Sequence, residues 1–410
     1  MTVSTNINHI FVSGEFSFDS MQRACAALHN LKRSGYTTIL VDLSAVTSCF
    51  AGSVVPFIFK CRQGREDGLD LALIPPRDLD LAKLFVNSNW LNTFDPATFP
   101  QSTAPYGRHI PALPFTDGES HFRAVDAIVH RLLGLFPNLD RDHFAALEWA
   151  INEITDNVLN HASSNIGGVV QLTTKTKSSI IEVVVCDVGF GIPKTLRDSN
   201  ASIIDDLSAL DLSIREGVTR NPVTNMGNGL FGSYSMSRLS GGYFHIYSGY
   251  ASLDYNGKDG SGLRVRRQSI PYSGTAIICG IGTKDPDLLL KALTFGGKSH
   301  VPGYSLLDRI GDADDKIEVL LRKESASFGS REIAREVRTK IENILRSTLK
   351  PVTLNMRGVT IVSSSYADEV FGKLAKDMGL GTFRSRVEIV GSNPNVHGVI
   401  SRAVKQRTET

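Results

Sequence analysis

Short apolar segments alternate with segments of helical period over most of this 410-residue chain. Runs typical of strands, bounded by glycine and polar residues, occur at 10–12, 38–43 and 71–74. Between them, apolar residues at three- and four-residue spacing predict helices at 21–31 and 54–62. Strands that alternate with helices predict an α/β fold class.

The same analysis divides the chain into parts. Residues 97–118 contain several prolines and have no periodicity, which predicts a linker. Two helices and four strands follow, at 122–135, 141–161, 169–174, 180–185, 243–248 and 275–280, and residues 250–273 are expected to be a hairpin or loop. A strand at 317–321, helices at 330–345 and 367–374 and a strand over 352–362 predict a second small α/β unit. We therefore expect domains at 1–96, 119–295 and 310–400.

Composition indicates a cytoplasmic protein. The formal charge is +2, from 44 basic and 42 acidic residues, which makes nucleic acid an unlikely partner. The five cysteines show no CxxC spacing, so we expect reduced thiols and neither a zinc site nor a disulfide framework. The first residues lack a secretory pattern, and no apolar run approaches the roughly 18 residues that span a membrane, so no membrane association is expected.

The segment from Arg141 combines an apolar and a polar helical stripe. Its apolar residues recur at steps of three and four and predict a core-facing side. Beside them, Glu153, Asn157, Asn160 and His161 share a second face about two turns long. A polar helix face is usually only solvated, so its significance depends on the segments that follow.

Two glycine-containing segments follow that helix. Asp187 comes directly after an apolar strand and is followed by Gly189 and Gly191, a combination that lets backbone approach a flat ligand beside a carboxylate. A second segment, GNGLFGSYSM, leads into a helix and offers backbone N–H groups to phosphate. Its glycines are Gly227, Gly229 and Gly232.

Taken in order, these segments resemble the GHKL family of ATPases, which includes DNA gyrase, sensor histidine kinases and MutL, over about residues 140–285. The resemblance implies a central Bergerat-fold α/β sandwich that binds ATP and Mg²⁺. It implies Glu153 as the general base, Asn157 as the magnesium ligand and Asp187 as the acceptor of the adenine amino group. Thr275 would support the adenine contact, residues 193–226 would form the ATP lid, and the glycines named above would lie beside the base or the phosphates.

Both flanks resemble STAS domains. The N-terminal unit does so through VDLSAVTSCFAGSVVPF, although Phe50 occupies the position where that family carries a phosphorylatable serine. The C-terminal unit does so through NMRGVTIVSSSYADEVFGKLAKDMG. Its serine cluster, Ser363, Ser364 and Ser365, precedes a helix and is first of all a capping motif, with phosphate acceptance as the functional alternative.

Three functions remain open on this sequence. The first is a bacterial regulatory protein, a signalling ATPase or serine kinase similar in arrangement to anti-sigma factors, with a protein partner bound through its STAS-like units. The second is a conformational ATPase that forms a homodimer when it binds ATP. The third is a non-catalytic module in which bound nucleotide controls partner binding.

Overall fold

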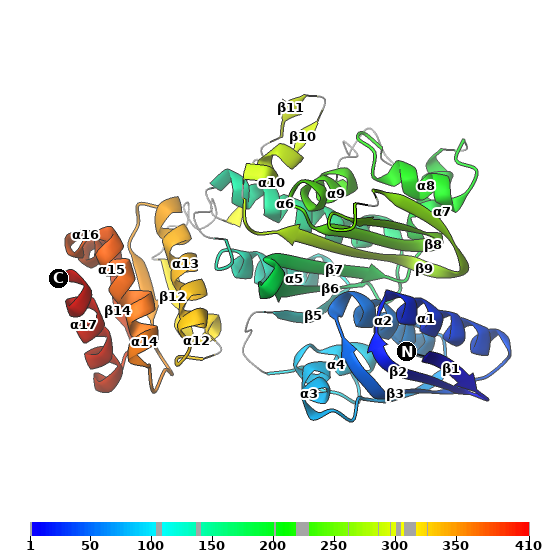
Figure 1. The fold of residues 1–410 in the computed structure, drawn as a ribbon, viewed down its shortest axis with the longest axis horizontal. Helices are drawn as coiled ribbons and strands as arrows, with labels where there is room; N and C mark the ends of the chain where they lie inside the picture. The colour runs from blue at the N-terminus through cyan, green and yellow to red at the C-terminus, as the bar shows by residue number, and fades with distance from the viewer. Residues whose placement is uncertain are drawn as a thin grey trace.

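The computed structural model describes residues 2–103, 109–136, 141–200, 202–218, 229–260, 262–285, 287–295, 297–300, 305–306, 317–325 and 327–409. Its helices and strands are arranged around three main sheets (Figure 1). The α/β class expected from the sequence is confirmed. The domain limits given above remain predictions.

The N-terminal sheet has four strands in the order β1-β2-β3-β4. Strands β2, β3 and β4 are parallel, while β1 pairs with β2 in the antiparallel sense. Parallel neighbours need a crossover, and helices α1 and α2 supply the two crossovers. The elements are β1 (Thr2–Asn6), β2 (His9–Phe16), α1 (Phe18–Arg33), β3 (Thr38–Cys49), α2 (Ala51–Glu66), β4 (Asp70–Ile74), α3 (Leu79–Asn87) and α4 (Trp90–Phe94).

The central sheet has five strands in the order β5-β6-β7-β9-β8, and every neighbouring pair is antiparallel. Strand β7 is buried along its whole length, which accounts for its nearly continuous apolar sequence IIEVVVCD. The elements are β5 (Ile110–Phe115), α5 (Gly118–Leu132), α6 (Arg141–Asn157), β6 (Gly168–Lys175), β7 (Ile180–Asp187), α7 (Gly191–Ser199), α8 (Asp206–Ser213), α9 (Gly229–Leu239), β8 (Tyr243–Asn256) and β9 (Arg264–Gly282).

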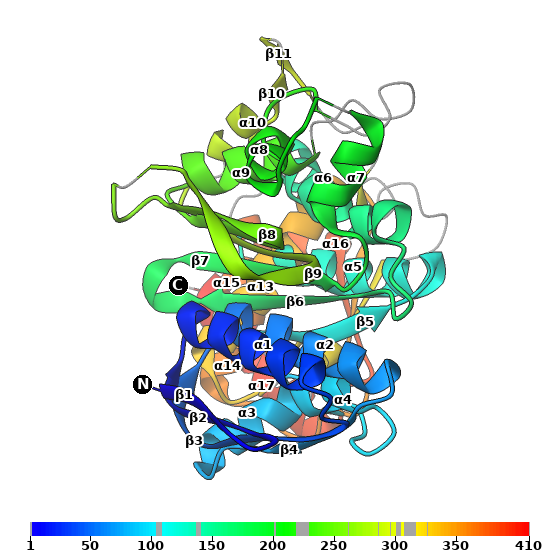
Figure 2. The ribbon, with the colours of Figure 1, turned by 90° about the vertical axis from the view of Figure 1, so that its right-hand side faces the viewer.

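Helices cover both faces of the central sheet. Side chains of α5, α6 and α9 join one core with Val183 and Val185 of β7. The alternate residues Val184 and Cys186 join a second core with α1 and α2. Helices α1 and α2 therefore lie between the N-terminal and central sheets, as both views show (Figures 1 and 2).

The C-terminal unit contains a three-stranded parallel sheet in the order β12-β13-β14. A short helix α10 and the β10–β11 hairpin precede it. The elements are α10 (Asp287–Ala292), β10 (Thr294–Phe295), β11 (Lys298–Ser299), β12 (Ile317–Leu320), α12 (Leu321–Glu324), α13 (Arg331–Ser347), β13 (Val352–Asn355), α14 (Ser364–Ala367), α15 (Lys373–Met378), α16 (Leu380–Arg386), β14 (Val387–Val390) and α17 (Pro394–Thr408).

Two sequence-based assignments are wrong. The expected linker contains β5, because an edge strand tolerates the prolines at positions 111 and 114 that obscured it. The strand expected over 352–362 ends at Asn355. Of the two forms expected at 250–273, the structure shows the hairpin, in which β8 and β9 extend beyond the sheet core.

Helix α13 packs against the end of α5 through buried polar contacts. The Asn343 side-chain amide donates to the carbonyl oxygens of Leu133 at 2.8 Å and Phe136 at 2.9 Å, and Asn343 is 1% exposed. Arg131 and Glu336 form an ion pair across the same contact at 2.6 Å. These contacts attach the C-terminal unit to the helices of the central sheet.

Asn343→Ala is expected to lower the free energy of unfolding by about 1–3 kcal/mol, because two buried carbonyls lose their donor. Urea unfolding followed by circular dichroism measures the change. Arg346→Ala, at an exposed position on the same helix, is the control and should be nearly neutral. Equal stability of the Asn343 variant and this control would contradict the assigned contact.

Candidate functional site

A buried carboxyl group marks the end of β7. Asp187 is 5% exposed, and its Oδ1 accepts a hydrogen bond from the Gly189 amide at 2.8 Å. Burial raises the pKa of Asp187 to about 6, while hydrogen bonds from the backbone amides of Gly189 and Thr275 and the charge of Lys60 oppose that rise. The group is therefore a hydrogen-bond acceptor held in a largely dry environment.

Ser248 connects the strands beside this carboxyl. Its Oγ donates to the Gly274 carbonyl at 2.8 Å and accepts from the Ile192 amide at 2.9 Å. The same hydroxyl lies 3.1 Å from Oγ1 of Thr275, which is buried. Residues of β8, β9 and the start of α7 thus surround Asp187 with a fixed set of polar groups.

Two glycines allow the backbone to approach closely here. A Cβ on Gly189 would lie 1.8 Å from the Ala162 carbonyl oxygen, and one on Gly274 would lie 2.3 Å from the Asp187 carbonyl oxygen. Gly274 also has a φ of +82°, which glycine adopts without strain. The turn around Asp187 therefore requires glycine at both positions. Gly191, the third glycine near this turn, begins α7 beside the Ser248 hydroxyl.

Glu153 of α6 lies against the start of α9. A Cβ added to Gly229, the first residue of α9, would lie 2.4 Å from the Glu153 Oε2. Burial and the neighbouring charge of Asp156 raise the pKa of Glu153. A half-buried carboxylate whose proton affinity is raised has the character of a general base.

The polar stripe of α6 ends in an irregular turn. Asn157 closes the α-helix and is half-buried, four residues after Glu153, so these two side chains share one face. Residues Val158–Ala162 form a π-helical turn, which the sequence analysis had treated as a continuation of the α-helix. Asn160 and His161 lie in that wider turn, so they do not keep the α-helical spacing that was expected to place them on one face with Glu153 and Asn157.

The remaining predicted site residues are two glycines and the expected lid. Gly227 lies outside the described residues. A Cβ on Gly232 would meet the Trp149 ring at 2.6 Å, so this glycine allows α9 to pack on α6. Within the expected lid at 193–226, α7 and α8 form a small apolar cluster of their own, and the Asp206 carboxylate accepts from the Tyr250 amide at 2.7 Å.

Sequence reasoning missed two residues of α2 near this site. The Gln63 side-chain amide donates to the Val188 carbonyl at 3.3 Å, and the charge of Lys60 acts on Asp187. They come from a segment more than 120 positions earlier in the chain. Their only sequence signal is that they are polar residues that follow the apolar first half of the helix.

The C-terminal serines occupy the start of α14. Ser363 is the N-cap, and its Oγ accepts from the Tyr366 amide at 3.1 Å and lies 3.0 Å from the Ser365 Oγ. Ser364 is exposed. The capping interpretation thus describes Ser363, and phosphate acceptance by any of the three serines remains a prediction.

A family profile described as a STAS-like domain of unknown function (DUF4325) matches residues 334–397. The C-terminal unit is therefore STAS-like. A search of curated proteins finds no match to the chain. No helix among the described residues is long and apolar enough to cross a membrane, and those residues contain no cluster of three His, Cys, Asp or Glu side chains suited to a metal ion.

Asp187→Asn tests the cost of ionising this buried carboxyl. Folding raises the pKa of Asp187 from 3.8 to about 6, so its favourable contribution is complete below pH 3.8 and is lost as the pH rises through about 6. Asparagine cannot ionise. The stability difference should therefore move in favour of the variant between about pH 4 and pH 7, by about 3 kcal/mol.

Urea unfolding of wild type and variant over this pH range measures that difference. Asp198→Asn is the matched control, since Asp198 lies exposed on α7 and its replacement should be nearly neutral. A pH-independent difference for Asp187→Asn would refute the raised pKa.

Proposed function

We propose that the chain binds ATP together with Mg²⁺ in the manner of the GHKL family and uses it in regulatory signalling. The observation that carries this proposal is the buried Asp187 carboxyl at the end of β7, beside a glycine turn and the Thr275 hydroxyl. It ends a strand of an antiparallel sheet, and the residues of that strand with the same alternation, Val183 and Val185, pack with α5, α6 and α9.

Recognition of adenine follows from the chemistry of Asp187. An ionised carboxylate accepts a hydrogen bond from the exocyclic amino group of adenine, and its fixed amide partners keep it oriented. A buried acceptor left without a donor is costly, which favours a base with an amino group over one with a carbonyl there. This accounts for a carboxyl kept in a place where burial opposes its charge.

Asn157 and Glu153 fit the phosphate side of such a site. The Asn157 side-chain oxygen is a hard ligand, and Mg²⁺ usually completes its shell with phosphate oxygens and water. Such a shell would need no cluster of carboxylates, and the described residues contain none. The start of α9 beside Glu153 adds backbone N–H groups for phosphate oxygens.

The proposed reaction transfers the γ-phosphoryl group. Glu153 takes the proton from the attacking hydroxyl, a new P–O bond forms to that oxygen, and the bond to the β-phosphate oxygen breaks to release ADP. If the attacking group is water, the product is phosphate. If it is a serine hydroxyl, the product is a phosphoserine, and Ser363, Ser364 and Ser365 are the first acceptors to examine.

The flanking units favour a regulatory role with a protein partner. The C-terminal unit is STAS-like, and its serine-bearing turn is partly exposed. In the N-terminal unit the corresponding turn is covered. Phe50 stacks against Phe18, and a Cβ on Gly52 would lie 3.0 Å from the Ile278 side chain of β9. The C-terminal turn is therefore the better candidate for a regulated contact.

Incubation of the full chain with Mg²⁺ and γ-labelled ATP tests this function, with free phosphate and protein-bound label followed separately. Glu153→Ala should lower turnover at least about 100-fold while ATP binding stays measurable. Asp187→Asn should weaken ATP binding about tenfold or more, because its single side-chain oxygen stays with the Gly189 amide and its NH₂ group faces the adenine amino group, donor against donor. Glu119→Ala, at an exposed position on α5, is the control and should behave as wild type.

The products separate the alternatives. Label on the protein supports a serine kinase, and free phosphate alone supports an ATPase, including one that dimerises on binding ATP. Binding without either product supports a nucleotide-controlled module. Absence of ATP binding by wild type, measured calorimetrically, would refute the proposal as a whole.

A further inference from the structure

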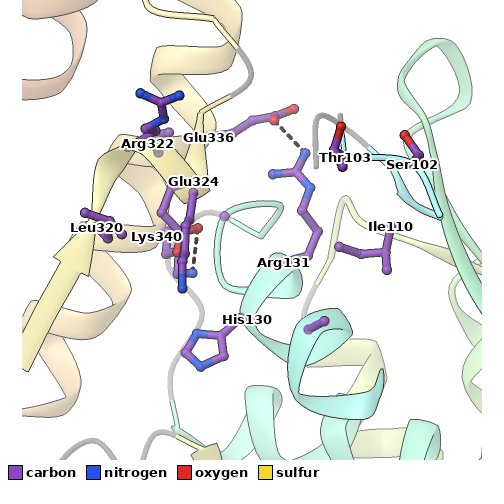
Figure 3. Close-up of a pocket in the computed structure, with 14 residues that line it drawn as sticks. Ser102, Thr103, Ile110, His130, Arg131, Leu320, Arg322, Glu324, Glu336 and Lys340 are labelled. Atoms are coloured by element: carbon purple, nitrogen blue, oxygen red, sulfur yellow. Dashed lines mark hydrogen bonds and ion pairs between the residues drawn. The ribbon is translucent and has the colours of Figure 1, made fainter. Parts of the chain in front are cut away.

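A cavity lies between α5 and the C-terminal unit, and none of the residues that line it belongs to the site around Asp187. Its volume is about 680 Å³, within the usual range of small-molecule sites. Its walls come from the C-terminal half of α5 on one side and from β12, α12 and α13 on the other (Figure 3). The cavity therefore joins two parts of the chain that are far apart in sequence.

Positive charge predominates in the lining. Four cationic side chains face two carboxylates, Glu324 and Glu336, and His130 lies at the same wall. The cationic residues are Arg131, Arg322, Lys323 and Lys340. The chain as a whole is nearly balanced in charge, so this local excess is a property of the cavity.

Two of the cations are held in place by the two carboxylates. Arg131 pairs with Glu336 at 2.6 Å, and Lys340, which is 4% exposed, pairs with Glu324 at 2.7 Å, as the dashed lines in Figure 3 mark. Burial lowers the pKa of Lys340, whereas Glu324 opposes this change. A further anion would stabilise the charged form of Lys340 and reduce the cost of burying it.

The other two cations lie at the rim. Arg322 and Lys323 are both exposed on α12, and one Arg322 nitrogen donates to the Gly358 carbonyl at 2.8 Å. Cations at the rim of a cavity attract an anion and complete its contacts once it has entered. The exposed cations therefore add positive charge at the entrance, while Arg131 and Lys340 lie inside.

Part of the remaining wall is apolar, and Ser102 and Thr103 add hydroxyl groups to it. Ile110, Ala127, Leu320 and Val337 line the apolar part. Inorganic phosphate alone would leave this surface and most of the 680 Å³ unused. A phosphate ester with a compact organic part would satisfy both the charges and the apolar wall.

We propose that this cavity binds a small organic phosphate, which connects α5 to the STAS-like C-terminal unit. The phosphate group takes the rim and buried cations as partners, and the organic part packs against the apolar wall. The ligand stabilises the contact between the two units because it binds only when both walls are in place. This inference does not depend on ATP binding.

Isothermal titration calorimetry of the full chain, without nucleotide, tests it with ribose 5-phosphate, and with ribose as the neutral control. Wild type should bind the phosphate ester and not ribose. The double variant Arg322→Ala/Lys323→Ala should bind about tenfold more weakly, because two charge-assisted contacts are lost. Both residues are exposed, so the variant should fold normally.

Glu324→Gln provides the opposite test. It removes the carboxylate that competes for Lys340, so affinity for ribose 5-phosphate should rise about threefold or more. Lys376→Ala, an exposed charge removal on α15, is the matched control and should change affinity less than about twofold. Asp187→Asn should leave ribose 5-phosphate binding unchanged, which separates this cavity from the proposed nucleotide site.

Two results would overturn the proposal. One is no heat of binding by wild type up to about 10 mM ribose 5-phosphate. A dissociation constant above this concentration is too weak for specific recognition. The other is binding that is lost in Asp187→Asn and kept in the double variant, which would assign the phosphate to the nucleotide site instead.

Discussion

The structure depends on the burial of helix α2 between two sheets. Eleven of its residues are buried, and they face both the N-terminal sheet and the central sheet. Residues 51–59 of this helix are all buried, so this part has to be covered on every side, and each large apolar side chain buried in this way contributes about 1.5–3 kcal/mol. The N-terminal unit and the central sheet consequently share one hydrophobic core.

This shared core brings the N-terminal unit to the candidate site. Gln63 reaches the Val188 carbonyl beside Asp187, and Tyr272 of β9 donates to the Pro56 carbonyl of α2 at 3.3 Å. The turn that carries the proposed adenine contact is therefore supported by a helix of another unit. The proposed nucleotide contact and the position of α2 depend on the same backbone, which gives a physical basis for communication between the two units.

The two carboxyl groups of the candidate site are fully or partly buried although burial makes their charged form less stable. Asp187 and Glu153 both have raised pKa values because burial opposes their charge. Groups whose burial lowers the stability of the fold are characteristic of binding and catalytic sites. A bound ligand compensates for that loss of stability. Most other buried carboxyls of the described chain have a cationic partner close by, as Glu182 has in Lys175 at 2.7 Å.

The sequence by itself determined the α/β class and most of the helices and strands, because local periodicity is a property of neighbouring residues, and it predicted Glu153, Asn157 and Asp187 as site residues. It did not determine strand β5, because prolines are unusual in strands and are tolerated mainly at an edge. It also did not determine the π-helical turn after Asn157. Both features depend on packing. Only the tertiary structure placed α2 between two sheets, brought Gln63 to Val188 and formed the cationic cavity between α5 and α13. These contacts join residues far apart in the chain. Their geometry depends on how whole helices and sheets pack, and a local pattern of residues does not predict that packing.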